Sequence, residues 1–226
     1  MQTMALILVL ALLDDKEAEE AIQKFKSTMK SPDVAIRVAA VTELGRIPHE
    51  RVLKALASCL ITDDRLVRVA AAKSLGAFQE KKSQATALLA DALAQNAKEP
   101  DVQAEILSAM KSLHEVGALG IAYRYIDDKN FKVAEAAIGI TAGVHSKASI
   151  DPLIRLMKKL TTAGDGVTSG DGTFDVPPDE ALRERARKLQ LAAAKALQAI
   201  TGEKFSTASE WDAWWKRDAA RFKIKE

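Results

Sequence analysis

Apolar residues recur along this chain at the spacing of amphipathic α-helices, in short segments separated by turn residues. The segment that follows Pro32 shows this pattern most plainly. Its apolar face consists of Val34, Val38, Val41 and Leu44. None of the segments alternates in the manner of a β-strand, so the chain is predicted to be all-α. The helices predicted over the first two thirds are 33–45, 49–61, 64–78, 83–97, 100–113, 118–126 and 131–144.

Two of these segments have nearly the same sequence. Asp33–Gly45 and Asp64–Gly76 share the motif Asp-x-x-x-Arg-Val-Ala-Ala-x-x-x-Leu-Gly, and the second copy begins 31 residues after the first. A helical repeat with a period of about 20 to 50 residues is typical of α-solenoids, in which each helix pair buries its apolar face against its neighbours. Weaker copies at Val133–Ile138 and Leu191–Leu197 complete an α-α superhelix of about five helix pairs.

The fifth pair contains a long insertion. It begins at Ile150, but residues 161–178 have loop composition throughout, and Asp179 is predicted to cap a delayed second helix. Because the insertion lies inside a repeat, it does not mark a domain boundary. The predicted organisation is an apolar segment at 1–13, one solenoid domain at 14–202 and a Trp-rich capping helix at 203–226.

The repeated motif resembles the second helix of HEAT repeats, a family of paired-helix α-solenoids. The resemblance is specific for the two copies and partial for the other three pairs, so it covers roughly residues 31–202. It implies a right-handed superhelix whose second helices line a concave surface, used mainly to bind other proteins. It also implies a ladder between repeats, made by an Asp at the turn and an Arg on the second helix. The residues that match the ladder are Asp33, Arg37, Asp64 and Arg68.

The C-terminal segment concentrates the large aromatic residues. Trp211, Trp214 and Trp215 share one helical face, which either covers the open end of the last repeat or binds a partner. Capping is the favoured interpretation. The helix is expected to begin with a capping box at either Thr207 or Ser209. The segment also resembles the terminal part of many bacterial HEAT-repeat proteins, which implies no activity.

The N-terminal segment leaves the location of the protein open. Met4–Leu13 is entirely apolar, has the length of a signal-peptide core and is too short to span a bilayer. No Lys or Arg precedes it and no small-x-small site precedes Asp14, so an apolar helix that folds onto the first repeat is an equally good interpretation. The protein is expected outside the cytoplasm if the segment is a signal peptide, and in the cytoplasm otherwise.

The balance of charged residues makes a nucleic-acid partner less favoured than a protein partner. The 33 Lys and Arg residues nearly balance the 31 Asp and Glu residues, and the net charge of +2 gives no general case for nucleic acid. A basic run keeps nucleic-acid binding as an alternative, although neighbouring Glu residues offset part of it. The run consists of Arg183, Arg185, Arg187 and Lys188.

Metal ligands are few. One HEAT-type enzyme family, deoxyhypusine hydroxylase, holds two irons with several His-Glu dipeptides, whereas this chain has only His49-Glu50 and His114-Glu115, both near helix ends. Such pairs do not supply four converging ligands. The insertion offers three carboxylates for calcium but no Glu at the twelfth position of an EF-hand, so a flexible loop is favoured. These carboxylates are Asp165, Asp171 and Asp175.

The favoured function is non-catalytic protein recognition. No nucleophile–base pair, phosphate-binding loop or paired-carboxylate site stands out, and no cofactor or metal is expected. Cys59, the only cysteine, lies in an apolar context that predicts a buried thiol. Lys73, Lys111 and Lys195 occupy comparable late positions on second helices and, with the three Trp residues, are the predicted partner contacts. The alternatives are a metal-dependent or lyase-type enzyme and a nucleic-acid-binding protein. Neither the partner nor the oligomeric state is predicted.

Overall fold

The computed structural model describes residues 2–164 and 180–224, with side chains described for 15–162 and 180–224. Within the described residues there are eleven α-helices and no β-strand, which confirms the all-α fold class. The chain divides into two compact units, Met1–Glu115 (unit 1) and Val116–Glu226 (unit 2). This division was not predicted, because the repeat pattern continues across it.

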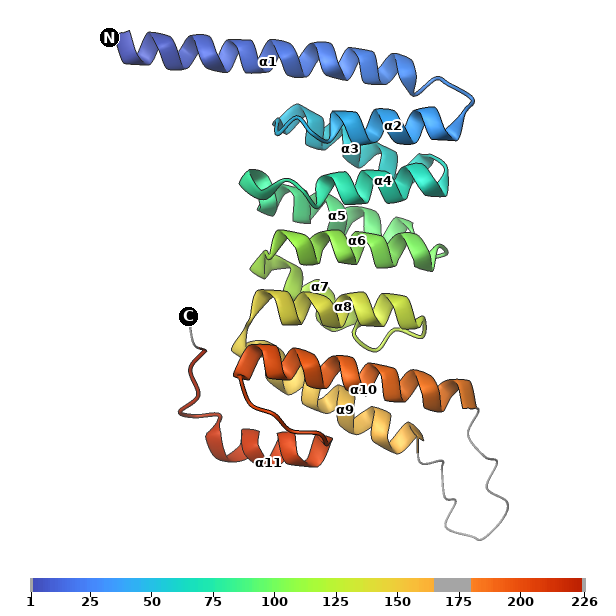
Figure 1. Ribbon diagram of the computed structural model, residues 1–226, viewed down its shortest axis with the longest axis vertical. Coiled ribbons are helices and arrows are strands. Elements are labelled where there is room, and N and C mark those ends of the chain that lie inside the picture. The colour runs from blue at the N-terminus through green and yellow to red at the C-terminus, as the bar shows by residue number, and fades with distance from the viewer. Residues whose placement is uncertain (1, 165–179, 225–226) are drawn as a thin grey trace. The chain divides into compact units, whose positions relative to one another are not determined.

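Unit 1 contains three helix pairs, each with a first helix followed by a second helix. The first helices are α1 (Gln2–Thr28), α3 (Glu50–Thr62) and α5 (Lys82–Gln95), and the second helices are α2 (Val34–Leu44), α4 (Arg65–Leu75) and α6 (Pro100–Leu113). The second helices lie side by side in one layer, with α3 and α5 behind them (Figure 1). Fully buried Leu residues fill the space between the layers, among them Leu53, Leu56, Leu60, Leu75 and Leu89.

Unit 2 contains two further pairs and a terminal helix. These are α7 (Leu119–Tyr125) with α8 (Phe131–Val144), α9 (Ile150–Gly164) with α10 (Glu180–Thr201), and α11 (Ala208–Asp218). Helix α10 packs against both α8 and α9, and α11 covers α9 (Figure 1). The five helix pairs agree with the predicted number. The terminal helix is shorter than the predicted 203–226, because it begins only at the cap residue Thr207 and ends at Asp218.

Two predicted boundaries differ from the structure. Helix α1 passes through the predicted border between residues 13 and 14, since no Pro or Gly interrupts it. The predicted loop at 161–178 begins too early, because α9 continues to Gly164 and the hydroxyl groups of Thr161 and Thr162 donate to carbonyls of the preceding turn. The rest of the insertion, including Asp179, lies outside the described residues. In the described part of the chain no helix is long and apolar enough to cross a membrane.

The glycines that end the two repeated segments allow neighbouring second helices to approach closely. Gly45 and Gly76 have ordinary right-handed backbone angles, with φ of −62° and −65°, so a left-handed turn does not explain them. A Cβ atom at Gly45 would lie 2.6 Å from Cβ of Ser74 on α4, and one at Gly76 would lie 2.9 Å from Cα of Ala109 on α6. The Leu-Gly end of the motif is therefore a helix-packing feature.

We expect Gly76→Ala to destabilise the protein by about 1 to 3 kcal/mol, because the added methyl group meets the backbone of α6 rather than a flexible side chain. Urea unfolding followed by circular dichroism measures the change. Gly120→Ala on α7 is the control, since its Cβ would have nothing within 4 Å, and its stability should be unchanged or slightly raised. Equal unfolding midpoints for Gly76→Ala and the unmodified protein would contradict the close-packing explanation.

Candidate partner-binding groove

Helix α2 leaves most of its apolar surface uncovered. Its sequence is apolar on nearly all sides, yet only Val41 and Leu44 are buried. Val34 and Val38 are half-buried and Ile36 is 47% exposed. A helix with apolar residues all round is normally enclosed by its protein. In the part of the chain that the structure describes, α1, α3 and α4 contact α2 but leave these apolar side chains partly exposed, so they can meet a partner.

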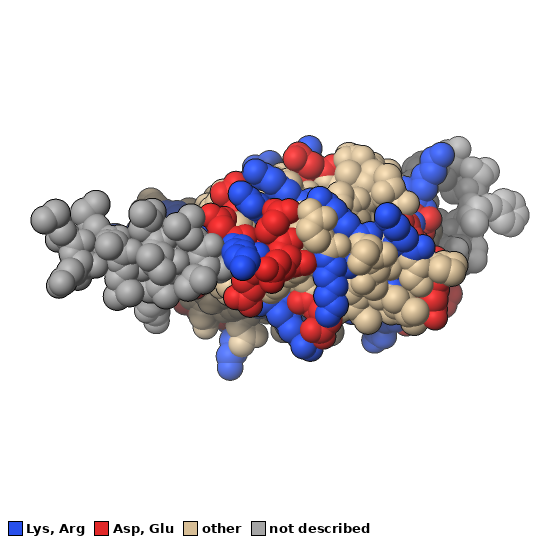
Figure 2. Space-filling model, turned by 90° about the horizontal axis from the view of Figure 1, so that it is seen from above, with Lys and Arg blue, Asp and Glu red and all other residues tan. Residues whose placement is uncertain are grey.

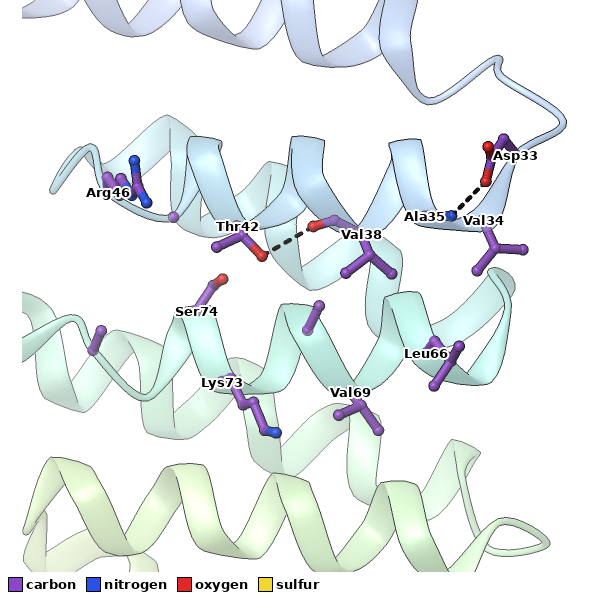
Figure 3. Close-up of a pocket in the computed structure, with 13 residues that line it drawn as sticks. Asp33, Val34, Ala35, Val38, Thr42, Arg46, Leu66, Val69, Lys73 and Ser74 are labelled. Carbon is purple, nitrogen blue, oxygen red and sulfur yellow. Dashed lines mark hydrogen bonds between the residues drawn. The ribbon is translucent and has the colours of Figure 1, made fainter.

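A groove of about 920 Å³ runs between α2 and α4 (Figure 3). Val34 and Leu66 lie toward one end, Val38 lies between the helices, Val69 contributes from α4, and Leu66 is 55% exposed. The floor is formed by small residues, which are Ala35, Gly45, Ala70, Ser74 and Ala77. The groove therefore offers branched apolar side chains above a shallow floor, a surface that suits an apolar partner segment.

The opposite end of the groove is cationic. Arg46 and Lys73 both line it there (Figure 3). Arg46 pairs with Glu43 at 2.9 Å and Lys73 with Glu105 at 3.7 Å, but both cations are more than 60% exposed. Exposed ion pairs of this kind contribute at most about 1 kcal/mol. Each cation can therefore exchange its present carboxylate for one from a partner at little cost.

A half-buried ladder joins the repeats of unit 1, but its acidic residue is not the predicted one. Arg37 on α2 pairs with Asp63 at the end of α3, with Nη2 and Oδ1 3.0 Å apart. The predicted acids, Asp33 and Asp64, instead cap α2 and α4, each accepting a backbone N–H at 2.8 Å. The sequence Asp63-Asp64 could have indicated this pairing. One N-cap residue is enough for α4, so the carboxylate of the other Asp is free to pair with an arginine.

The second rung of the ladder adds a buried amide to a carboxylate, since Nη2 of Arg68 also lies 3.6 Å from Oε1 of Glu99. Nη1 of Arg68 donates to Oδ1 of Asn96 at 2.7 Å, and Nδ2 of Asn96 donates to the carbonyls of Leu60 and Ala92 at 2.9 and 2.8 Å. Asn96 is only 1% exposed. An ionised Asp has no donor for the two carbonyls, which explains why the acid of the first rung gives way to Asn here. Arg37 and Arg68 are thus structural residues.

Comparison with known proteins agrees with this geometry. Residues 4–76 and 22–111 match the family model of HEAT repeats. Residues 4–111 of the chain therefore consist of HEAT repeats. The match begins at residue 4, so it takes in the apolar part of α1, and it includes both helices of the groove and both rungs of the ladder.

No curated protein matches the chain at a significant level. Two solved structures are similar to it in fold. A chain of the CpcE–CpcF complex of phycocyanin lyase from Nostoc sp. PCC7120 is 21% identical, with a TM-score of 0.46, over 76% of this chain and 71% of that chain. An engineered protein is 16% identical, with a TM-score of 0.40, over 89% of this chain and 90% of that chain. At these identities the likeness concerns the fold alone.

The predicted partner lysines do not form one set. Lys73 lines the groove, whereas Lys111 is exposed on α6 and does not line it. Lys195 is exposed on α10 and belongs to unit 2. The sequence analysis missed Val38, Leu66 and Arg46 as groove residues, because their meeting depends on how two helices from separate repeats pack.

The Trp residues of α11 cap unit 2. Trp211 and Trp214 are 0% and 6% exposed, so neither presents a binding surface, and the predicted partner role is wrong for both. Their rings lie 5.8 Å apart at 85°, and Phe205 meets Trp211 edge-on at 4.9 Å. Trp215 is half-buried with Lys147 over its ring. The capping interpretation is confirmed, and the capping box is the one at Thr207.

Three carboxylates hold the cap in place, and each has a lowered pKa. Backbone and side-chain hydrogen bonds from Thr207 lower the pKa of Glu210. Hydrogen bonds from Lys158 and Lys216 lower the pKa of Asp212, which ties α11 to α9 through the Lys158 contact at 2.7 Å. Arg221, assisted by Arg217, lowers the pKa of the buried Asp218.

The two His-Glu pairs lie at helix ends, where their His residues have structural roles. His49 caps α3 by accepting the Arg51 N–H at Nδ1, and its Nε2 donates to Asp15 at 3.0 Å. His114 ends α6 in a left-handed conformation. In the described residues no three His, Cys, Asp or Glu side chains lie close enough to hold an ion, and Asp165, Asp171 and Asp175 lie outside them. Cys59 is buried as predicted, and burial raises its pKa to about 11, so its thiol is neutral.

We expect acid to loosen the α11 cap. Because the folded pKa values lie below the ordinary 4.5 of Glu and 3.8 of Asp, the stability that these carboxylates contribute is complete above the ordinary values and disappears as the pH falls through the lowered ones. All three Trp residues are on α11, so a red shift of Trp fluorescence below about pH 4 reports the cap directly. Asp212→Asn should loosen the cap already at neutral pH. An acid transition that this substitution leaves unchanged would argue against the assignment.

Proposed function

We propose that this protein is a non-catalytic scaffold that recognises another protein through the groove between α2 and α4. The supporting observation is the apolar surface of α2, of which only Val41 and Leu44 are buried. Charged residues border this surface, an arrangement typical of protein interaction sites, which combine an apolar centre with a polar rim.

The groove suits an amphipathic helix as its occupant. Its lining on α2 extends from Val34 to Arg46, which is about 18 Å at the rise of an α-helix. Apolar residues of the partner at helical spacing would contact Val38, Leu66 and Val69, and an acidic residue would reach Arg46 and Lys73 at the other end. Helix-in-groove binding of this kind obtains its affinity from the apolar anchors and its orientation from the charges.

Charge supports a protein partner over a nucleic acid at this site. On the end of the molecule that Figure 2 shows from above, which is not the face of the groove, acidic and basic side chains are interspersed. Glu43 pairs with Arg46 at the cationic end of the groove, and Asp33 lines the other end. A nucleic acid requires a continuous basic stripe. The enzyme and nucleic-acid alternatives stay predictions.

We expect Leu66→Glu to weaken partner capture at least about tenfold, because it places a charge in the apolar part of the groove. Its melting temperature should change little, since Leu66 is 55% exposed. The measurement is affinity purification of the tagged protein from its native host with quantitative mass spectrometry, followed by titration of the captured partner.

Ile61→Glu is the matched control. Ile61 is an apolar residue of unit 1 that is 43% exposed, but it lies on α3 and does not line the groove. It should capture the partner as well as the unmodified protein does. If Leu66→Glu and Ile61→Glu bind the partner equally, the groove is not the binding site.

A further inference from the structure

Unit 2 carries a second groove, of about 480 Å³, between α10 and the segment that leads to α11. Helix α10 contributes Arg187, Leu191 and Lys195, which follow one another at intervals of one helical turn and so share a face. The connecting segment contributes Lys204 and Phe205 from the other side. Helix α10 and the segment that directly follows it thus bring three cations to one hollow.

These cations have no ion pair of their own in the described part of the chain, and the carboxylate that one of them influences is Glu184, whose pKa is lowered by Lys188 with help from Arg187. Arg187, Lys195 and Lys204 are all exposed, no carboxylate lines the groove, and none of the three has an ion pair or hydrogen bond within the described residues. Among neighbouring acids, Glu184 binds Lys188 and Glu210 binds Thr207. The cations of α9 and α11 differ from the groove cations, because every one of them is paired with a carboxylate. They are Arg155, Lys158, Lys159, Lys216 and Arg217.

The same groove offers a fixed apolar surface between the charges. Leu191 is 57% exposed and stands between Arg187 and Lys195 on α10. Phe205 is half-buried, with its ring centroid 4.9 Å from Trp211 and 6.1 Å from Trp214. Because both Trp rings are buried in the cap, Phe205 is held in place before any ligand arrives. A rigid aromatic platform binds with a small loss of conformational entropy.

We propose that this groove binds an acidic peptide segment of a protein partner, with an apolar side chain of that segment placed between its carboxylates. The three cations pair with the carboxylates, and Leu191 and Phe205 contact the apolar residue. Charge steers the segment to the groove, and the apolar contact holds it there. Lys195, which the sequence analysis singled out as a partner contact, lies within this site. The site is independent of the groove in unit 1.

A peptide fits these observations better than a nucleic acid does. The basic run of α10 is dispersed, because Arg185 donates to the carbonyl of Asp128 and Lys188 pairs with Glu184. Only Arg187 of that run lines the groove. A nucleic acid needs a longer array of cations along its phosphates, and it would leave Leu191 without an apolar partner.

The test is fluorescence anisotropy with labelled synthetic peptides that keep one Leu and replace flanking Gln residues stepwise by Glu. Affinity for the full protein should rise with each Glu at low salt. In the variant Arg187→Glu/Lys195→Glu/Lys204→Glu, the most acidic peptide should bind at least about tenfold more weakly. The corresponding triple Gln variant, which introduces no new charge, should show a smaller loss. Replacing the peptide's Leu by Ser should also weaken binding.

The matched control reverses three exposed cations of unit 2 that do not line the groove, in the variant Lys129→Glu/Arg183→Glu/Lys223→Glu. Its net charge equals that of the groove variant, and it should bind the acidic peptides as the unmodified protein does. Circular dichroism melts should be alike for all variants. Equal losses in the groove and control variants, or no binding of any acidic peptide, would overturn the proposal. Tighter binding of a duplex oligonucleotide, abolished in the groove variant, would replace the peptide by a nucleic acid.

Discussion

The close approach of neighbouring second helices is the constraint on which unit 1 depends. At Gly45 and Gly76 there is no space for a Cβ atom, because Ser74 and Ala109 of the next second helix occupy it. A solenoid has no contact between distant repeats, so its stability is a sum of such neighbour interfaces. The repeated Leu-Gly end of the motif records this packing requirement, and a larger residue at either position would push one pair away from the next.

The small residues that allow this approach also create the groove. Between α2 and α4 the floor is made by Ala70, Ser74 and Ala77 beside Gly45, and these side chains are too short to fill the space between the helices. The side chains of Val38 and Leu66 therefore extend beyond the small residues at the base of the groove, and the space beside them stays unfilled. The small residues between α2 and α4 thus allow both the close helix packing and the groove. A substitution that fills the groove would have to preserve the distance between these helices.

Local patterns predicted the helices well, and contacts between helices poorly. Helix α8 was predicted with both ends correct, because Asn130 supplies an N-cap and the apolar spacing is regular up to Val144. The ladder was assigned to Asp64 when the acid is Asp63, since capping and pairing compete for adjacent carboxylates. Neither groove could be predicted, because each depends on side chains from elements whose spacing the sequence pattern does not specify.

The ladder ends where unit 1 ends. Arg37 pairs with Asp63 and Arg68 with Asn96, but the equivalent position of α6 is Glu105, which pairs with Lys73 on α4 instead. Arg37 and Arg68 donate hydrogen bonds from this position, whereas the ionised carboxylate of Glu105 has no donor. Glu105 therefore cannot form a rung of the same kind. Loss of an arginine from one copy therefore does two things. It leaves α6 without the arginine that makes a rung in α2 and α4, and it gives Lys73 an exposed carboxylate partner that an incoming acidic residue can replace.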